Sequence, residues 1–112
     1  PYSLAPDIRS AMQKSRVRTP RESRLMRRAY HAMSQAEYGL GWRVYDYEGR
    51  RVIGHRGAVQ GYRSLILFDP GIRTGIAILW NSTSGYPVGL QLEVMDQVYE
   101  RPRRDWMRLG RR

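Results

Sequence analysis

The sequence predicts an α+β fold, in which an antiparallel β-sheet meander is flanked by helices. Apolar residues recur with a helical period before residue 38 and after residue 85, and alternate with a period of two in between. Turn signals at Glu48-Gly49 and Asp69-Pro70-Gly71 separate the alternating runs. Because such short turns join neighbouring strands, the strands are expected to be antiparallel.

Two helices are expected in the first third of the chain. Pro6 opens a short one, because its fixed φ suits a first helical turn. Thr19-Pro20-Arg21-Glu22 matches a capping box, in which the Thr19 and Glu22 side chains each bond the other's backbone N–H. Apolar residues then follow at helical spacing: Leu25, Met26, Ala29 and Met33. A second helix is therefore expected from about Pro20 to Met33, with residues 34–37 as its exit loop.

Four strands are expected between residues 38 and 80. Alternation begins at Tyr38, and the turn at Glu48-Gly49 leads into a second strand over residues 51–55. A third strand is expected over residues 62–68. Residues 74–80 are apolar throughout, which indicates a central strand covered on both faces.

The last element is expected to be a helix that opens at Tyr86-Pro87 and ends at Pro102. Its apolar residues have the spacing of one helix face: Val88, Leu92, Met95 and Tyr99. The expected organisation is a helical lead-in over residues 1–37, a sheet plus C-terminal helix over residues 38–101, and a frayed basic tail over residues 102–112.

The chain has 112 residues and a formal net charge of +10, with arginines dense in residues 9–28 and 101–112. Solvated basic faces, or pairing with acidic residues on another portion of the protein, explain this charge most simply. Binding of nucleic acid or an anionic surface remains an alternative. There is no cysteine, the two histidines fall on different elements, and no metal site or cofactor is predicted. No apolar run approaches the roughly 20 residues that span a bilayer, and no signal peptide is recognised.

Four segments in order, the second of which contains the strand-flanked triplet His55-Arg56-Gly57, carry a resemblance to a known family. They are Tyr38-Gly39-Leu40-Gly41-Trp42, Gly54-His55-Arg56-Gly57-Ala58-Val59-Gln60-Gly61-Tyr62-Arg63-Ser64, Asp69-Pro70-Gly71 and Gly75-Ile76-Ala77-Ile78-Leu79-Trp80-Asn81. The chain resembles the C-terminal portion of the serine β-lactamase and penicillin-binding-protein family, in its class C-like or esterase-like branches. The resemblance implies the C-terminal part of a β-lactamase/transpeptidase-like fold.

The resemblance also implies roles for the residues of this triplet. Ala58 would present a backbone N–H as half of an oxyanion hole, and Gly57 would let a substrate approach the backbone. His55 takes the place of a lysine and would accept or donate hydrogen bonds near neutral pH; a strand-end histidine satisfied by backbone is the alternative. Gln60 and Tyr62 would border the substrate. Arg56 is also a candidate there, although alternation turns its side chain to the opposite face.

The family's nucleophile motif, Ser-x-x-Lys, is absent, because the one lysine is Lys14 and Ala11 precedes it by three. A Tyr-x-Asn motif is absent too, since Leu79 stands two residues before the one asparagine, Asn81. The expected partner is therefore an N-terminal portion of the same hydrolase that carries the serine, and the substrate a small acyl compound (a β-lactam, an ester or a D-amino-acid peptide). The chain alone is expected to be inactive and to self-associate through an exposed sheet edge. By resemblance, the protein is expected to be periplasmic or in the cell envelope. The alternatives are a small basic binding module and a hydrolase remnant kept for interactions.

Overall fold

The computed structural model describes residues 4–110, apart from the side chains of Arg27 and Arg28. It confirms the expected α+β class and antiparallel meander. Arg111 and Arg112 of the expected basic tail lie outside the described residues. The elements in chain order are α1 (Pro6–Gln13), β1 (Val17–Arg18), α2 (Pro20–Ala29), β2 (Met33–Tyr38), β3 (Arg43–Tyr47), β4 (Arg50–Val59), β5 (Tyr62–Asp69), β6 (Thr74–Trp80) and α3 (Tyr86–Val98).

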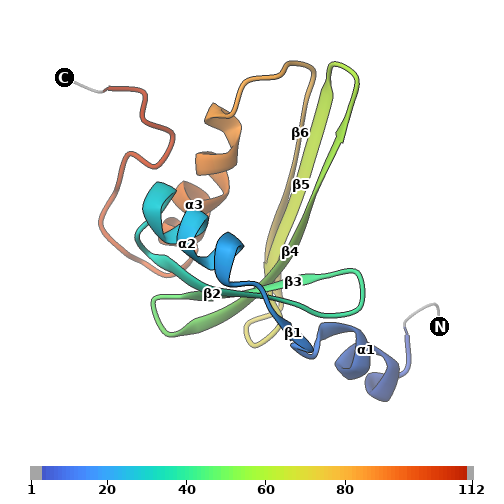
Figure 1. The fold of residues 1–112 in the computed structure, drawn as a ribbon. Helices are drawn as coiled ribbons and strands as arrows, with labels where there is room; N and C mark the ends of the chain where they lie inside the picture. Colours follow the sequence, from blue (N-terminus) through green and yellow to red (C-terminus); the bar gives the residue numbers. More distant parts are fainter. Residues whose placement is uncertain (1–3, 111–112) are drawn as a thin grey trace.

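The sheet has six strands in the order β1-β2-β3-β4-β5-β6, and each neighbouring pair is antiparallel. Strands β1 and β2 lie mostly within residues 1–37, where helices and their connecting loops were expected but no strand. Helices α2 and α3 lie on the same side of the sheet, whereas α1 lies apart from them (Figure 1). None of the described helices is both long and apolar enough to cross a membrane.

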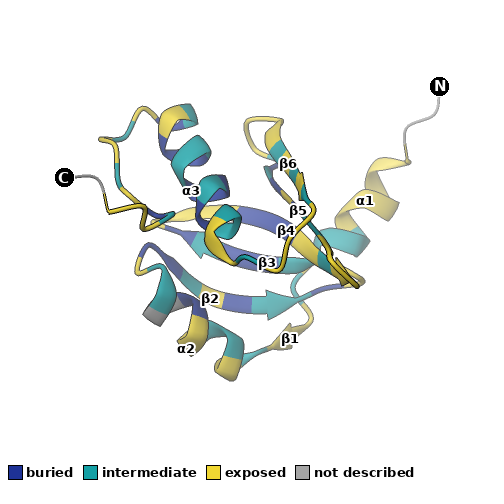
Figure 2. Ribbon diagram, turned by 90° about the horizontal axis from the view of Figure 1, so that it is seen from above, coloured by how far each residue is buried: buried dark blue, intermediate teal, exposed yellow. Residues whose placement is uncertain are grey.

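The hydrophobic core lies between the sheet and helices α2 and α3. Tyr45, Tyr47 and Leu67 face this core from the sheet, and Leu92 and Met95 of α3 pack against them. All five side chains are at most 6% exposed. Buried positions line the inner sides of the strands and of α3, and exposed positions line the outer surfaces (Figure 2). The spacing predicted for the last helix is thus confirmed, because its apolar face packs on the sheet.

The expected helix from Pro20 to Met33 ends earlier, at Ala29, and β2 replaces the expected exit loop. Met33 and Ala36 are both fully buried although they lie three residues apart, which is a helix-like spacing. A β-bulge explains it: the register between β2 and β3 shifts within β2, where Gln35 has a φ of 51°. The extra residue changes the phase of the strand, so its inward positions no longer alternate.

Thr19 and Glu22 do not form the expected capping box. The Thr19 hydroxyl donates to the carbonyl oxygen of Ala36 in β2, and no described side chain caps the start of α2. Glu22 pairs instead with Arg56 of β4. Both side chains bond residues of the sheet instead of the helix backbone, and both contacts attach α2 to the sheet.

Strand β6 is an edge strand and not the expected central one. In the part of the chain that the structure describes, it pairs with β5 alone. Ile76 and Ile78 are half-buried on the helix side, whereas Ala77 and Leu79 are exposed on the other face. One face of this apolar strand is therefore uncovered in the described chain.

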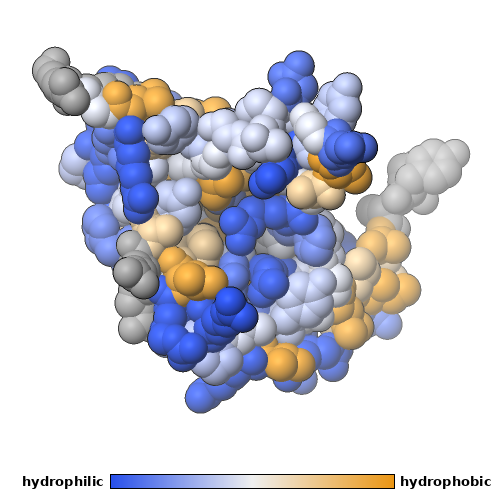
Figure 3. Space-filling model, turned by 45° about the horizontal axis from the view of Figure 1, so that its top comes forward, coloured by the Kyte–Doolittle hydropathy of each residue, from blue (hydrophilic) through white to orange (hydrophobic). Residues whose placement is uncertain are grey.

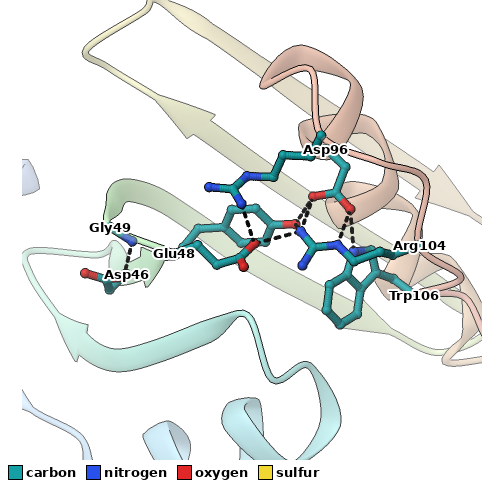
Figure 4. Close-up of polar contacts among 8 residues, drawn as sticks. Asp46, Glu48, Gly49, Asp96, Arg104 and Trp106 are labelled. Atoms are coloured by element: carbon teal, nitrogen blue, oxygen red, sulfur yellow. Dashed lines mark hydrogen bonds and ion pairs between the residues drawn. The ribbon is translucent and has the colours of Figure 1, made fainter.

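The segment after α3 folds back onto the helix instead of fraying, and α3 ends before the expected Pro102. Trp106 is buried, and its Nε1 donates to Asp96 over 2.8 Å. Arg104 bridges the carboxylates of Asp96 and Glu48, as Figure 4 shows. The burial of an indole ring and the pairing of a buried carboxylate both favour this docked position over a solvated tail.

Candidate functional site

The predicted site lies where β4 extends past the end of β3. The β3–β4 ladder stops at the pair Arg43 and Gly54, whereas the β4–β5 ladder continues to the pair Val59 and Tyr62. The β4–β5 hairpin therefore projects beyond β3 (Figure 1). Within the described residues, the stretch 55–59 has a neighbouring strand on one side only.

The register shows which backbone groups of this stretch lack a strand partner. Glu48 and Gly49 form a two-residue turn with φ of 49° and 91°, so the flanking pair Tyr47 and Arg50 is hydrogen-bonded between β3 and β4. Hydrogen-bonded pairs alternate along an antiparallel ladder, so the even-numbered residues of β4 direct their backbone groups toward β3. Ala58 is even-numbered and lies beyond the ladder, so its N–H points to the open edge.

His55 and Gly57 share the sheet face that α2 and α3 do not cover. His55 is exposed and lies opposite Ile66 of β5, and Gly57 lies opposite Ser64. A Cβ on Gly57 would come within 2.7 Å of the Ser64 Oγ. This glycine therefore leaves room for a hydroxyl at the triplet, in addition to exposing its backbone.

Arg56 points to the opposite, helix-covered side of the sheet. Its Nη2 donates to Glu22 Oε1 of α2 over 3.0 Å. The guanidinium also lies near the hydroxyl of Tyr45; burial raises the pKa of Tyr45, and the positive charge of Arg56 partly opposes that rise. Arg56 therefore faces α2, whereas His55 and Gly57 face the open side.

The other two predicted residues lie at the tip of the same hairpin. Gln60 and Gly61 form its exposed two-residue turn, and Gly61 has a φ of 76°. Tyr62 is 63% exposed and shares the open face with Val59, its partner across the hairpin. The structure thus brings His55, Gly57 and Tyr62 onto one face, with the Ala58 amide at its edge.

Two neighbours of the triplet were missed from the sequence, Ser64 and Glu22. Ser64 could have been found by counting the register outward from the turn at Gln60-Gly61, which pairs it with Gly57. Glu22 could not, because a helix residue 34 positions away has no sequence signal for contact with Arg56.

This arrangement can bind and polarise an acyl group but holds no paired nucleophile and base. A backbone N–H at an unpaired edge can donate to a carbonyl or developing oxyanion, and an exposed imidazole can bind a polar substituent. No cluster of described His, Asp and Glu side chains could hold a metal ion. The site is an open surface; a hollow of about 480 Å³ lies elsewhere, between α1 and the β5–β6 turn.

Comparison with known proteins identifies one family. A family model described as Beta-lactamase matches residues 2–97, which is most of the chain and includes every predicted site residue. Neither the curated proteins nor the solved structures include a significant match.

Proposed function

Because the chain belongs to the beta-lactamase family, we propose that it forms one wall of a serine hydrolase active site. In this proposal it is the C-terminal portion of a class C-like or esterase-like enzyme. The reaction would be acyl transfer on a β-lactam, an ester or a D-amino-acid peptide. The nucleophilic serine would come from an N-terminal portion of the same hydrolase, since these 112 residues contain no Ser-x-x-Lys.

The unpaired edge of β4 carries the proposal. The Ala58 N–H points outward next to Gly57, where no described strand competes for it. When a serine oxygen adds to the substrate carbonyl, the carbonyl oxygen gains negative charge and accepts this hydrogen bond. Such a donor lowers the barrier by about 3–4 kcal/mol in comparable sites, provided that its direction is set before the reaction begins.

His55 would bind a polar group of the substrate and would take no part in breaking the acyl bond. Its exposed imidazole lies on the open face beside Gly57. An imidazole there can bind a carboxylate when protonated, or accept a hydrogen bond when neutral. Tyr62 and Gln60 at the hairpin tip would border the substrate from the same hairpin.

The uncovered sheet face supports the need for a second portion of protein. Val59 is 71% exposed, Leu79 is 79% exposed and Ile66 is 39% exposed, and all lie on the face away from α2 and α3. Another apolar stretch covers α1 near the N-terminal end of the described chain (Figure 3). Burial of this surface would stabilise a complex at about 25 cal/mol per Å² of apolar area.

The intact mass of the protein from its native source tests this proposal. A mass well above 13.1 kDa, together with labelling of the product by a serine-directed acylating probe, is the expected result. A mass equal to that of this chain, with no co-purifying partner and no labelling, would overturn it.

A basic binding module is the second candidate, favoured by the exposed arginines of β1 and α2. Arg18, Arg21 and Arg24 are all exposed, and no described carboxylate forms an ion pair with them. The C-terminal arginines support it less, because Arg104 and Arg101 pair with carboxylates of the same chain. Retention on heparin that falls steeply with salt would favour this candidate.

A further inference from the structure

We propose that Arg56 is a positioning residue. Its ion pair with Glu22 holds residues 55–59 of β4, which have a neighbouring strand on one side only (the unpaired half of β4), and so fixes the direction of the Ala58 amide. This inference rests on the proposed function of that amide. It gives Arg56 a task different from the substrate contact that its place in the triplet suggests.

The unpaired half of β4 needs such a support because it has one neighbouring strand instead of two. From His55 onward, the described chain pairs it with β5 alone. A strand with one neighbour is held by half as many ladder hydrogen bonds and can twist or fray more easily. An amide that must point at one atom of a substrate tolerates little such motion.

Arg56 is placed to supply this support. It lies two residues before Ala58, so both residues are on the same strand face, toward α2. Its guanidinium bonds Glu22 on α2 over 3.0 Å. The same guanidinium also lies near the hydroxyl of the buried Tyr45 on β3. One ion pair thus links the projecting part of β4 to α2.

Glu22 is a fixed partner because α2 is itself attached to the sheet. The side chain of Glu22 is 17% exposed, whereas that of Arg56 is 43% exposed. Met26 of the same helix is buried in the core. The Ser23 hydroxyl donates to the carbonyl oxygen of Ala36 in β2 over 3.0 Å, which anchors the first turn of α2.

Amide hydrogen exchange of the 112-residue chain tests the inference without a catalytic serine. The reporters are the N–H groups of Gly57 and Val59, which the ladder alternation directs toward β5. In Arg56→Ala both are expected to exchange about two- to fivefold faster, the change that loss of a partly exposed ion pair produces. Arg56→Lys should recover part of the protection, because lysine keeps the charge but not the planar fork.

Arg24→Ala is the matched control, since it removes the same charge from an exposed position of α2. It should leave both reporter amides unchanged. Glu22→Gln should reproduce the effect of Arg56→Ala, and it guards against a folding defect in that variant. Unchanged exchange of Gly57 and Val59 in both Arg56→Ala and Glu22→Gln would overturn the inference.

The complete hydrolase separates this inference from the proposed function. If both hold, Arg56→Ala lowers kcat and leaves KM nearly unchanged, because the amide acts in the transition state. If exchange accelerates but no acylating probe ever labels the complete product, Arg56 positions β4 and the proposed function fails. If labelling occurs and exchange does not change, the hydrolase stands and the positioning role is wrong.

Discussion

Arg104 donates two parallel hydrogen bonds to the carboxylate of Asp96, from Nε to Oδ2 over 2.9 Å and from Nη2 to Oδ1 over 2.7 Å. Tyr47 and Trp106 donate to the same carboxylate (Figure 4). The carboxylate therefore joins β3, α3 and the C-terminal segment at one buried point. Bidentate pairs of this kind are stronger and more directional than single ion pairs.

Removal of the Asp96 carboxylate is expected to destabilise the fold. Asp96→Ala leaves the Tyr47 hydroxyl, the Trp106 N–H and the Arg104 guanidinium without their shared acceptor. The expected loss is about 2–4 kcal/mol in the free energy of unfolding, measured by urea denaturation. Asp7→Asn, on the exposed face of α1, should change it by less than about 0.5 kcal/mol. Equal effects of the two variants would contradict the role of Asp96.

Acid should weaken the fold through the same carboxylate. Burial acts to raise the pKa of Asp96, but hydrogen bonds from Arg104, Tyr47 and Trp106 outweigh it and lower the pKa below its ordinary value of 3.8. A lowered folded-state pKa contributes stability above the unfolded pKa, and that stability is lost as pH falls through the folded value. The urea concentration at the midpoint of unfolding should therefore decrease once the pH is lowered below about 4. In Asp96→Asn this part of the pH dependence should disappear; an unchanged profile would contradict the assignment.

A methyl group at Gly57 should clash with Ser64. The added Cβ would lie 2.7 Å from the Ser64 Oγ, so Gly57→Ala should cost about 1–2 kcal/mol of stability. The double variant Gly57→Ala/Ser64→Ala should recover most of that loss, because the hydroxyl is then gone. Thermal denaturation of the four proteins measures the coupling, and strictly additive effects would show that the two residues do not meet.

The uncovered sheet face should make the isolated chain self-associate. Leu79 on β6 is 79% exposed on this face, so Leu79→Glu is expected to shift sedimentation velocity profiles toward monomer. Leu109→Glu is the control, because Leu109 is 52% exposed on the C-terminal segment instead of the sheet. A wild-type chain that stays monomeric at all concentrations would refute this expectation.

The strands from β3 to β6 could be predicted because their signals are local. Glu48-Gly49 specifies a tight hairpin turn, and both residues have positive φ in the structure. By contrast, the segment of β2 is predicted from the sequence as a helix end at Met33 and an exit loop over residues 34–37. Met33 continues the helical spacing of the apolar residues before it, and the bulge at Gln35 removes the alternation that would indicate a strand. A bulge breaks the period of two on which strand prediction depends.

Contacts between residues far apart in the sequence limited how much of the candidate site could be predicted. The triplet was found from its motif, and its open face followed from alternation along β4. The partners of the triplet depend on register and helix docking, which bring Ser64 and Glu22 to it. The docked C-terminal segment was missed for the same reason. Its many arginines suggested a solvated tail, and nothing local in the sequence indicates that Trp106 bonds the buried Asp96 of α3.

The acylation rate of an Ala58→Pro variant of the complete hydrolase tests the central claim most directly. Proline lacks the N–H, and within the described residues this N–H makes no ladder bond, so the variant is expected to keep the strand. Ala58→Val, which keeps the N–H, is the control. We expect labelling by a serine-directed probe to slow by about 10²–10³-fold in Ala58→Pro only. Labelling of Ala58→Pro at the wild-type rate would contradict the assignment of this amide to an oxyanion hole.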